Sequence, residues 1–345
     1  MNHLITDNGS NAERVFPLIG GDEVTSDPRH RYQRFAIDFS DFPLRRSSEL
    51  KSWHLMSESD RVQCKTRGIA PADYPNPVAE DWPDLLAIVI KRVKPERDKQ
   101  PTQATRNRWW QYERSRPALY KRISPLDSVL VNSSKATPHH AIARIERGLI
   151  YTQNLNVFSF DRMGAFCAIS CRAHEVWARF VGTTFEDRMT YVKEDCFETF
   201  PFPLNFERSL DFEVAGRTYH EHRAALMIAR NEGMTKTYNR FHDRTETTED
   251  IQHLRELHAA MDRAVLEAYG WHDLAARAKP IFLDETNEDN HTYQGRIFWP
   301  SDFRDEVLAR LLALNAERHA EEVRLGIAPG MKGKTQDEVE EYEEE

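Results

Sequence analysis

Catalytic signature motifs are scarce in this 345-residue sequence. No glycine-rich loop follows a predicted strand, because Gly20 and Gly21 stand alone, so the sequence has no signature for a nucleotide or S-adenosylmethionine pocket. It also lacks an Asn/Asp-Pro-Pro-aromatic motif, a P-loop, a Gly-x-Ser-x-Gly elbow and a His-Glu-x-x-His pair. These absences predict a chain that is non-catalytic on its own, with no catalytic residue and no bound cofactor.

Cysteines and long apolar runs are also few. Four cysteines in 345 residues do not make a disulfide framework, which favours a reducing compartment. The longest apolar run, Leu85–Ile90, is far shorter than the ~20 residues needed to cross a bilayer. The first residues show no basic region followed by an apolar stretch, as a signal peptide would. With a mean hydropathy of −0.69, the chain is expected to be a cytoplasmic protein without a membrane partner.

One group of residues resembles a metal site. Cys167, Cys171 and His174 are spaced i, i+4 and i+7 on a predicted helix, and Cys196 follows. Such ligands suit zinc in principle, but the same spacing is the core stripe of a helix, and cysteine is a common small buried residue. The pattern favours packing over metal binding, so no metal is predicted.

Positive charge is concentrated in one part of an acidic chain. The whole sequence has a net charge of −9, whereas Leu86–Leu149 contains 14 Lys and Arg against 5 Asp and Glu. Within it, residues 106–122 (RNRWWQYERSRPALYKR) interleave six cations with four aromatic residues. Cations that meet phosphate and rings that pack or stack are typical of a nucleic-acid surface. A solvated helix with its aromatic face in the core fits the composition about as well.

The chain divides into four predicted regions. Residues 1–105 mix short apolar runs with turns, 106–206 carry strands at 128–132 and 156–160, and 207–328 are dominated by helix. Residues 329–345 are predicted to form a disordered acidic tail. Apolar periodicity predicts helices over 163–180, 219–231, 249–269 and 300–324, with Ser301 or Asp302 as the N-cap of the last and Gly270 closing the third.

The order of several short motifs carries a resemblance. From residue 109 onward the sequence reads WWQYERSRPALY, VNSSK, FSFD, HEVWAR, GTTFEDRMTY and DCFETFPFP. In this order the motifs resemble the target-recognition region of type IIG and IIL (MmeI-like) restriction–modification DNA adenine methyltransferases, and are similar to the BREX methyltransferase PglX. Similarity extends upstream through VFPLIGGD (15–22) and RFAIDF (34–39). Downstream it includes GMTKTYNRFH (233–242) and ARLLALNAERHAEEV (309–323).

The resemblance implies a fold and a partner. It implies an α/β (α+β) recognition domain followed by a mainly α-helical spacer, in a system that methylates the amino group of adenine in double-stranded DNA. Family members carry the methyltransferase domain before this region, and here residue 1 lies where that domain has already ended. The expectation is therefore a specificity subunit, or one part of a split or truncated gene. A methyltransferase subunit or domain would then hold S-adenosylmethionine.

Two residue sets are predicted to meet DNA. Phosphate contacts supply grip and register, and base-edge contacts supply the sequence code. The phosphate candidates are Arg114, Arg116, Lys121, Arg122 and Lys135. The base-reading candidates are Glu186, Asp187 and Arg188, which match the charged loop that reads base pairs in the resembled family. A carboxylate can accept from cytosine and an arginine can fork onto guanine, but an ordinary polar turn would have the same residues.

Several aromatic residues are predicted to have a structural role, and two alternative functions are also consistent with the sequence. One of Trp109 and Trp110 is predicted to be core, because neighbouring side chains point different ways; His174 and Trp177 are predicted to be architectural. A non-sequence-specific nucleic-acid-binding protein would need the cations and aromatic residues of 106–122, which we call the basic block, but no base-reading loop. A helical scaffold protein of a defence complex would use the C-terminal helices and leave the basic block incidental.

Overall fold

A computed structural model describes residues 4, 6, 8–185 and 188–328, and the description below is confined to them. The chain forms two compact units. Unit 1 comprises Met1–Ile19, Tyr32–Pro125 and Arg147–Tyr151, and unit 2 comprises Gly20–Arg31, Leu126–Glu146 and Thr152–Glu345. This division differs from the predicted boundaries at 105 and 206. Those boundaries separate regions with different predicted functions, and they remain a prediction. The predicted tail, 329–345, lies outside the described residues.

Unit 1 is built from short elements around a small aromatic core. Its helices are α3 (Glu58–Arg67), α4 (Pro83–Arg92), α5 (Lys94–Asp98), α6 (Gln103–Asn107) and α7 (Pro117–Ile123), with 3-10 turns at Gly9–Glu13, Trp53–Leu55 and Ala79–Asp81. The apolar run Leu85–Ile90 has a sequence that fits either a helix or a buried strand, and the structure shows that it belongs to helix α4. It starts at Pro83, whose missing N–H costs nothing in the first helical turn. Its face with Leu85 and Val89 packs against Phe39 and Trp110.

Two small sheets complete unit 1. Strand β1 (Val15–Ile19) pairs antiparallel with β2 (Arg34–Ile37) and parallel with β7 (Ile150–Tyr151), while β3 (Arg45–Ser47) pairs parallel with β4 (Ile69–Pro71). Gly68 links α3 to β4 with φ +74°, a conformation that favours glycine. A Cβ at this position would lie 2.2 Å from the Trp110 ring. Glycine is therefore required for Trp110 to enter the core.

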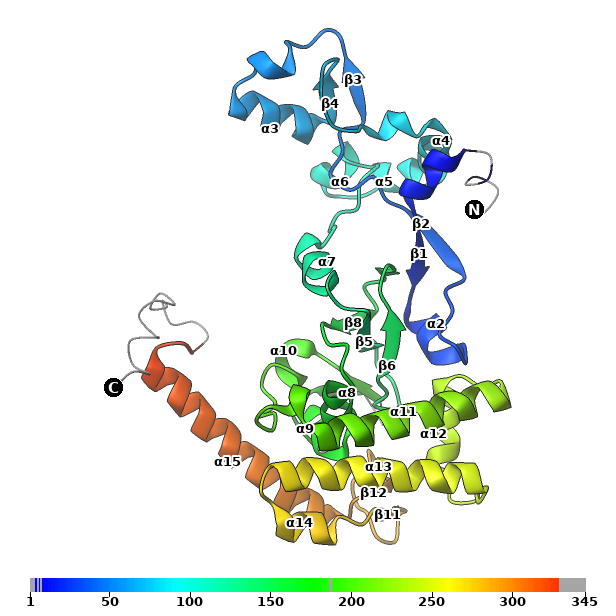
Figure 1. The fold of residues 1–345 in the computed structure, drawn as a ribbon, viewed down its shortest axis with the longest axis vertical. Helices are drawn as coiled ribbons and strands as arrows, with labels where there is room; N and C mark the ends of the chain where they lie inside the picture. Colours follow the sequence, from blue (N-terminus) through cyan, green and yellow to red (C-terminus); the bar gives the residue numbers. More distant parts are fainter. Residues whose placement is uncertain (1–3, 5, 7, 186–187, 329–345) are drawn as a thin grey trace. The chain divides into compact units, whose positions relative to one another are not determined.

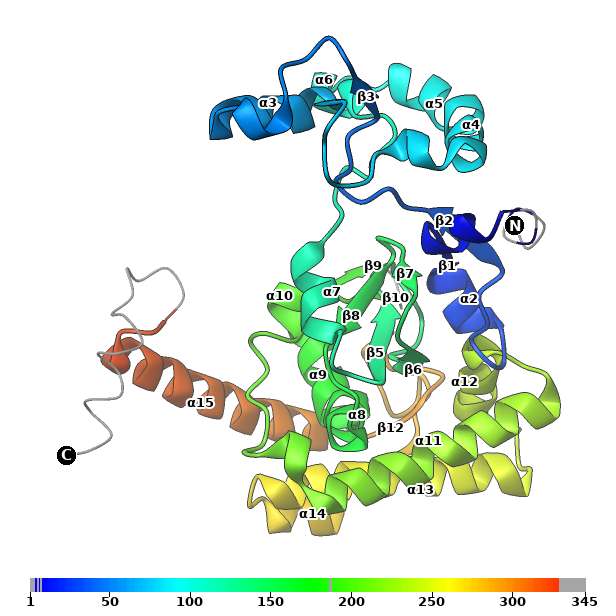
Figure 2. The ribbon, with the colours of Figure 1, turned by 45° about the horizontal axis from the view of Figure 1, so that its top comes forward.

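Unit 2 contains a three-stranded antiparallel sheet with β5 (Ser128–Ser133) at its centre. Strand β5 pairs with β6 (Ala143–Glu146) on one side and β8 (Leu155–Phe158) on the other. Its residues 128–132 are all buried, which explains its continuous apolar run. Helices α8 (Met163–Ser170) and α9 (Arg172–Val181) follow, and then the antiparallel pair β9 (Thr183–Phe185) and β10 (Arg188–Thr190). Figure 2 shows these elements beside the C-terminal helices.

The predicted helix over residues 163–180 is two helices. Cys171 is extended, with φ −71° and ψ 160°, and ends α8 before α9 begins at Arg172. The Arg172 N–H donates to Asp262 Oδ1 at 2.8 Å, and Arg172 Nη1 donates to Asp262 Oδ2 at 2.5 Å. Burial alone would raise the pKa of Asp262, but the Arg172 guanidinium lowers it to about 2. A carboxylate from a distant helix thus caps α9 and separates it from α8.

Five helices dominate the rest of unit 2. They are α11 (Leu210–Arg230), α12 (Met234–His242), α13 (Glu249–Ala268), α14 (His272–Arg277) and α15 (Ser301–Leu325). The smaller elements are α2 (Gly21–Ser26), α10 (Lys193–Cys196), the 3-10 turn Phe206–Arg208, and the strand pair β11 (Ile281–Phe282) and β12 (Ile297–Phe298). Helix α11 lies on α8 and α13 (Figure 1), and Gly216 lets it approach so closely that a Cβ there would be 2.3 Å from Met163 O. The apolar faces of α11 and α13 are thus used within the chain.

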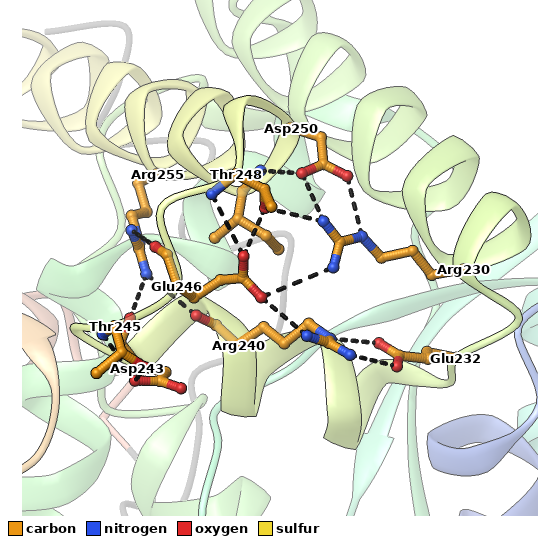
Figure 3. A network of polar contacts seen from close by, with 10 residues as sticks. Arg230, Glu232, Arg240, Asp243, Thr245, Glu246, Thr248, Asp250 and Arg255 are labelled. Atoms are coloured by element: carbon orange, nitrogen blue, oxygen red, sulfur yellow. Dashed lines mark hydrogen bonds and ion pairs between the residues drawn. The ribbon is translucent and has the colours of Figure 1, made fainter.

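A network of ion pairs fixes helix α12 between α11 and α13 (Figure 3). Arg240 on α12 bonds Glu232 at 2.8 Å through Nε and Glu246 at 2.8 Å through Nη1. Arg230 at the end of α11 reaches Asp250 on α13 at 2.7 Å. Arg255 donates to backbone carbonyls of residues 240, 241, 243 and 246. Three helices therefore share one set of charged groups, and α12 also packs against α2.

The predicted fold class is confirmed: an α/β recognition region is followed by a mainly helical C-terminal region. Gly270, with φ +76°, closes α13 as predicted. The predicted N-cap of α15 is wrong, because Ser301 and Asp302 lie inside the helix and Pro300 occupies the cap position. A proline disfavours a helical backbone in the residue before it, and Pro300 itself is not helical. The helix therefore begins at the residue after Pro300. Among the described residues, no helix is both long and apolar enough to span a bilayer.

Candidate nucleic-acid interface

The aromatic part of the basic block belongs to the core of unit 1. Trp110 is buried and its Nε1 donates to Phe42 O at 2.9 Å, while Trp109 is half-buried with its ring centroid 5.8 Å from that of Trp110. The prediction that one of the pair is core is confirmed. Arg106 donates to the carbonyls of Gln100 and Pro101 at 2.6 and 2.8 Å, so its guanidinium stabilises the preceding turn.

The cations after the tryptophans differ from Arg106 in their surroundings. Arg114, Arg116, Lys121 and Arg122 are all exposed, and none forms an ion pair with another described residue. Arg116 has φ +50° directly before Pro117, where the proline ring disfavours an α-helical backbone. Lys121 and Arg122 lie in the last turn of α7, which Ile123 anchors in the core. These four charges are therefore solvated and open to an external anion.

Charge is distributed unequally between the two units. Unit 1 contains 20 Lys and Arg against 14 Asp and Glu, whereas unit 2 contains 27 against 42. In unit 2 many arginines are neutralised by acidic residues, as in the pairs Arg172–Asp262, Arg179–Glu175 and Arg304–Glu288. The free cations of the basic block thus belong to the positively charged unit, which is where phosphate contacts are expected.

Unit 2 brings Lys135 close to the predicted base-reading residues. Thr137 and Met189 form an isolated antiparallel bridge, each donating its N–H to the other's carbonyl at 3.0 Å. Lys135 is two residues before Thr137 and exposed, and Arg188 is adjacent to Met189 and exposed. Glu186 and Asp187 lie outside the described residues. The bridge therefore joins the connection after β5 to the hairpin β9–β10, and each of the two segments has an exposed cation.

The inner side of this surface is rigid. Met189 and Tyr191 are buried at 2% exposure, and the Tyr191 hydroxyl shares a 2.8 Å hydrogen bond with His174 Nε2. The Asn156 side chain bridges Tyr191 O and Asn132 Oδ1, at 3.0 and 2.9 Å. His174 and Trp177 are fully buried, so their predicted architectural role is confirmed. Outward residues such as Arg188 are thus carried on a strand with a fixed inner face.

The cysteines serve packing. All four are free and buried, and burial raises the pKa of Cys171 to about 12 and that of Cys196 to about 11. Across the described residues, no group of three or more His, Cys, Asp or Glu is arranged to hold a metal ion.

The contacts that hold the segment Pro138–His140 could not be predicted from the sequence. The segment Pro138–His140 leads from the Thr137 bridge toward β6, and it is held by Arg179, Asn239 and Arg296. These partners are 41 to 158 positions away from the residues they bind, and no periodic pattern or motif links them to the segment. Only the adjacent histidines at 139 and 140 hint at an unusual environment.

Comparison with known proteins identifies the class of this region. Residues 75–204 match the family model described as "MmeI, target recognition domain". The match spans the basic block, the Lys135 connection and the β9–β10 hairpin, and confirms the resemblance predicted for this part of the chain.

One solved structure is similar, the type IIL restriction-modification enzyme MmeI in complex with DNA. Its sequence identity to the chain is 16%, with a TM-score of 0.49 over 92% of this chain and 33% of that chain. The chain therefore spans about a third of the length of the protein it matches. No curated protein matches the sequence.

Proposed function

We propose that this chain recognises a specific double-stranded DNA sequence for a restriction–modification or phage-defence system. The match of residues 75–204 to a target recognition domain carries this proposal. Two features of the site support it: the solvated cations Arg114, Arg116, Lys121 and Arg122, and the paired segments that present Lys135 and Arg188. The four cations and Lys135 suit phosphate, which has no sequence information, and Arg188 suits base edges.

The methylation chemistry is proposed to belong to a partner. A methyltransferase domain or subunit outside residues 1–345 would bind S-adenosylmethionine and act on adenine. A base inside a duplex must be flipped out before an enzyme can modify it, so the DNA has to be gripped on both sides of the target. This chain would supply part of the grip and the sequence code. The four free, buried cysteines agree with a proposed cytoplasmic location.

The proposal is tested by selection from a library of random-sequence duplexes. Duplexes retained by the full chain are sequenced, and a recurring motif is expected. A retained pool as random as the input, with equal binding to single-stranded DNA and RNA, would favour the non-sequence-specific alternative. Failure to retain any nucleic acid would favour the scaffold alternative, in which the C-terminal helices bind other proteins.

A further inference from the structure

The connection between β5 and β6 is held in place by α9 and by the C-terminal helical region of unit 2. Pro138 O accepts hydrogen bonds from Arg296 Nη2 and, at 3.4 Å, from Arg179 Nη2. A few residues later, Ile142 O accepts from Arg223 Nη2 at 2.7 Å. Each of these arginines is buried, at 7% exposure or less. Buried guanidinium groups with several fixed partners are rigid anchors, so the carbonyls they bind are also fixed.

The His139 side chain extends from this connection and packs against helix α12. Its Nε2 donates to Asn239 Oδ1 at 2.7 Å, because an amide oxygen can only accept. The ring stacks on His242 with a centroid distance of 5.2 Å and on Tyr238 at 5.8 Å. Burial lowers the pKa of His139 to about 4, which keeps the stacked ring neutral at neutral pH. Three residues of α12 thus define where His139 lies.

The contact continues directly to the predicted base-reading hairpin. Thr137 precedes Pro138 and exchanges two backbone hydrogen bonds with Met189, next to Arg188. Helix α12 itself is fixed by the ion pairs of Arg240 with Glu232 and Glu246 (Figure 3). A continuous set of contacts therefore runs from α12, through His139 and Thr137, to Met189.

We propose that α12 sets the position of the recognition hairpin, with Asn239 as a positioning residue for base discrimination. The inference rests on the proposed function. Hydrogen bonds to base edges depend on placement within a fraction of an ångström, whereas phosphate attraction falls off slowly with distance. A looser connection would therefore reduce discrimination between sequences while leaving non-specific binding almost unchanged.

Asn239 is the suitable position for a test because it is exposed, so its truncation leaves no cavity. Asn239→Ala removes the acceptor of His139, and Asn239→Asp keeps an oxygen there and should rescue the effect. The matched control is Asn315→Ala on α15, which removes the 2.6 Å hydrogen bond from Asn315 Nδ2 to Thr199 O. Both alanine variants remove one side-chain hydrogen bond within unit 2, but only the first touches the β5–β6 connection.

The first readout is hydrogen exchange of the Thr137 and Met189 amides in the full chain without DNA. We expect exchange about 3- to 10-fold faster in Asn239→Ala, which is the effect of removing one hydrogen bond on a local opening equilibrium. Asn239→Asp and Asn315→Ala should exchange like the wild type. Unchanged exchange in Asn239→Ala, or an equal increase in Asn315→Ala, overturns the proposal.

The second readout is the affinity ratio between a library-selected duplex and the same duplex with one base pair changed in its motif. Asn239→Ala is expected to lower this ratio by about 3- to 10-fold, with affinity for random-sequence duplex unchanged. An unaltered ratio despite faster exchange would show that the hairpin does not read bases, which also overturns the proposal. A wild-type chain that selects no motif would instead overturn the proposed function, so the two failures are distinguishable.

Discussion

Thr137 and Met189 donate backbone N–H groups to each other's carbonyl oxygens, with nitrogen–oxygen distances of 3.0 Å in both directions. The two residues are 52 positions apart, and the bridge joins the connection after β5 to strand β10. Lys135 lies two residues before Thr137, and Arg188 directly precedes Met189. The bridge therefore joins two segments that have separate sequence motifs.

The first prediction concerns sequence specificity. Exchanging the charges at Glu186, Asp187 and Arg188 should change which site the assembled enzyme modifies, because each correct base contact is worth ~1–3 kcal/mol against the wrong base. That amounts to roughly 10- to 100-fold per position, enough to alter a sequenced methylation pattern. Thermal melting should be little changed, since Arg188 is exposed. If active variants still modify the original site, the base-reading residues lie elsewhere, and the Ser133–Lys135 segment is the next candidate.

The second prediction concerns contacts with DNA phosphates. Replacing Arg114 and Arg116 with Ala should weaken binding about equally for all sequences and reduce the slope of log K against log salt by ~2, close to one for each phosphate that is no longer neutralised. Arg217→Ala with Arg324→Ala is the matched control, because both arginines are exposed and paired to Glu213 and Glu321 on their own helices. An equal change in the control would show that only total charge matters.

The third prediction concerns catalysis. The isolated chain should neither bind S-adenosylmethionine nor transfer its methyl group to DNA, because the sequence has no cofactor loop and no Asn/Asp-Pro-Pro-aromatic motif. Calorimetry with the purified chain and a labelled-methyl transfer assay without a partner provide the measurement. Saturable binding of the cofactor would contradict the proposed division of labour between this chain and a methyltransferase.

The fourth prediction concerns pH. Burial, followed by repulsion from Arg223, lowers the pKa of His220 to about 3 from its ordinary value of 6.5. Between these values the unfolded chain binds a proton that the folded chain does not, so stability falls as pH drops below 6.5 and is complete above it. At 1.36 kcal/mol per pH unit, the loss from His220 between pH 6.5 and 4.5 is up to about 3 kcal/mol.

The His220→Phe variant isolates this effect. His220 Nδ1 is buried with no described hydrogen-bond partner, and its ring packs against Phe166 at 5.5 Å, so an apolar ring should be tolerated. Urea unfolding at pH 7.5 and 4.5 should show a smaller loss of stability in the variant. Burial also lowers the pKa values of His30 and His139, to about 4, and those of His140, His174 and His242, so these histidines contribute to the loss that remains. An identical loss in both proteins would refute the role of His220.

Local patterns predicted much of this architecture. Helices α13 and α15 and strands β5 and β8 follow apolar periodicity and turn residues, and their predicted bounds agree with the structure within a few positions. Helix α11 was predicted only in part, because it begins at Leu210 and not at residue 219. The break at Cys171 could not be predicted, because the apolar stripe continues through it and the capping carboxylate of Asp262 comes from 90 residues away. The hydrogen bonds that hold Pro138 and His139 also come from residues far away in the sequence. Contacts between distant segments leave no spacing in the sequence that a local pattern could reveal.

The most direct measurement of the central claim is an affinity ratio. The full chain would be titrated, at one fixed salt concentration, with a duplex containing its selected motif and with the same duplex after the motif is scrambled. The account predicts that the scrambled duplex binds ~10³-fold or more weakly, as is typical of specific recognition. Two dissociation constants within a few-fold of each other would contradict it.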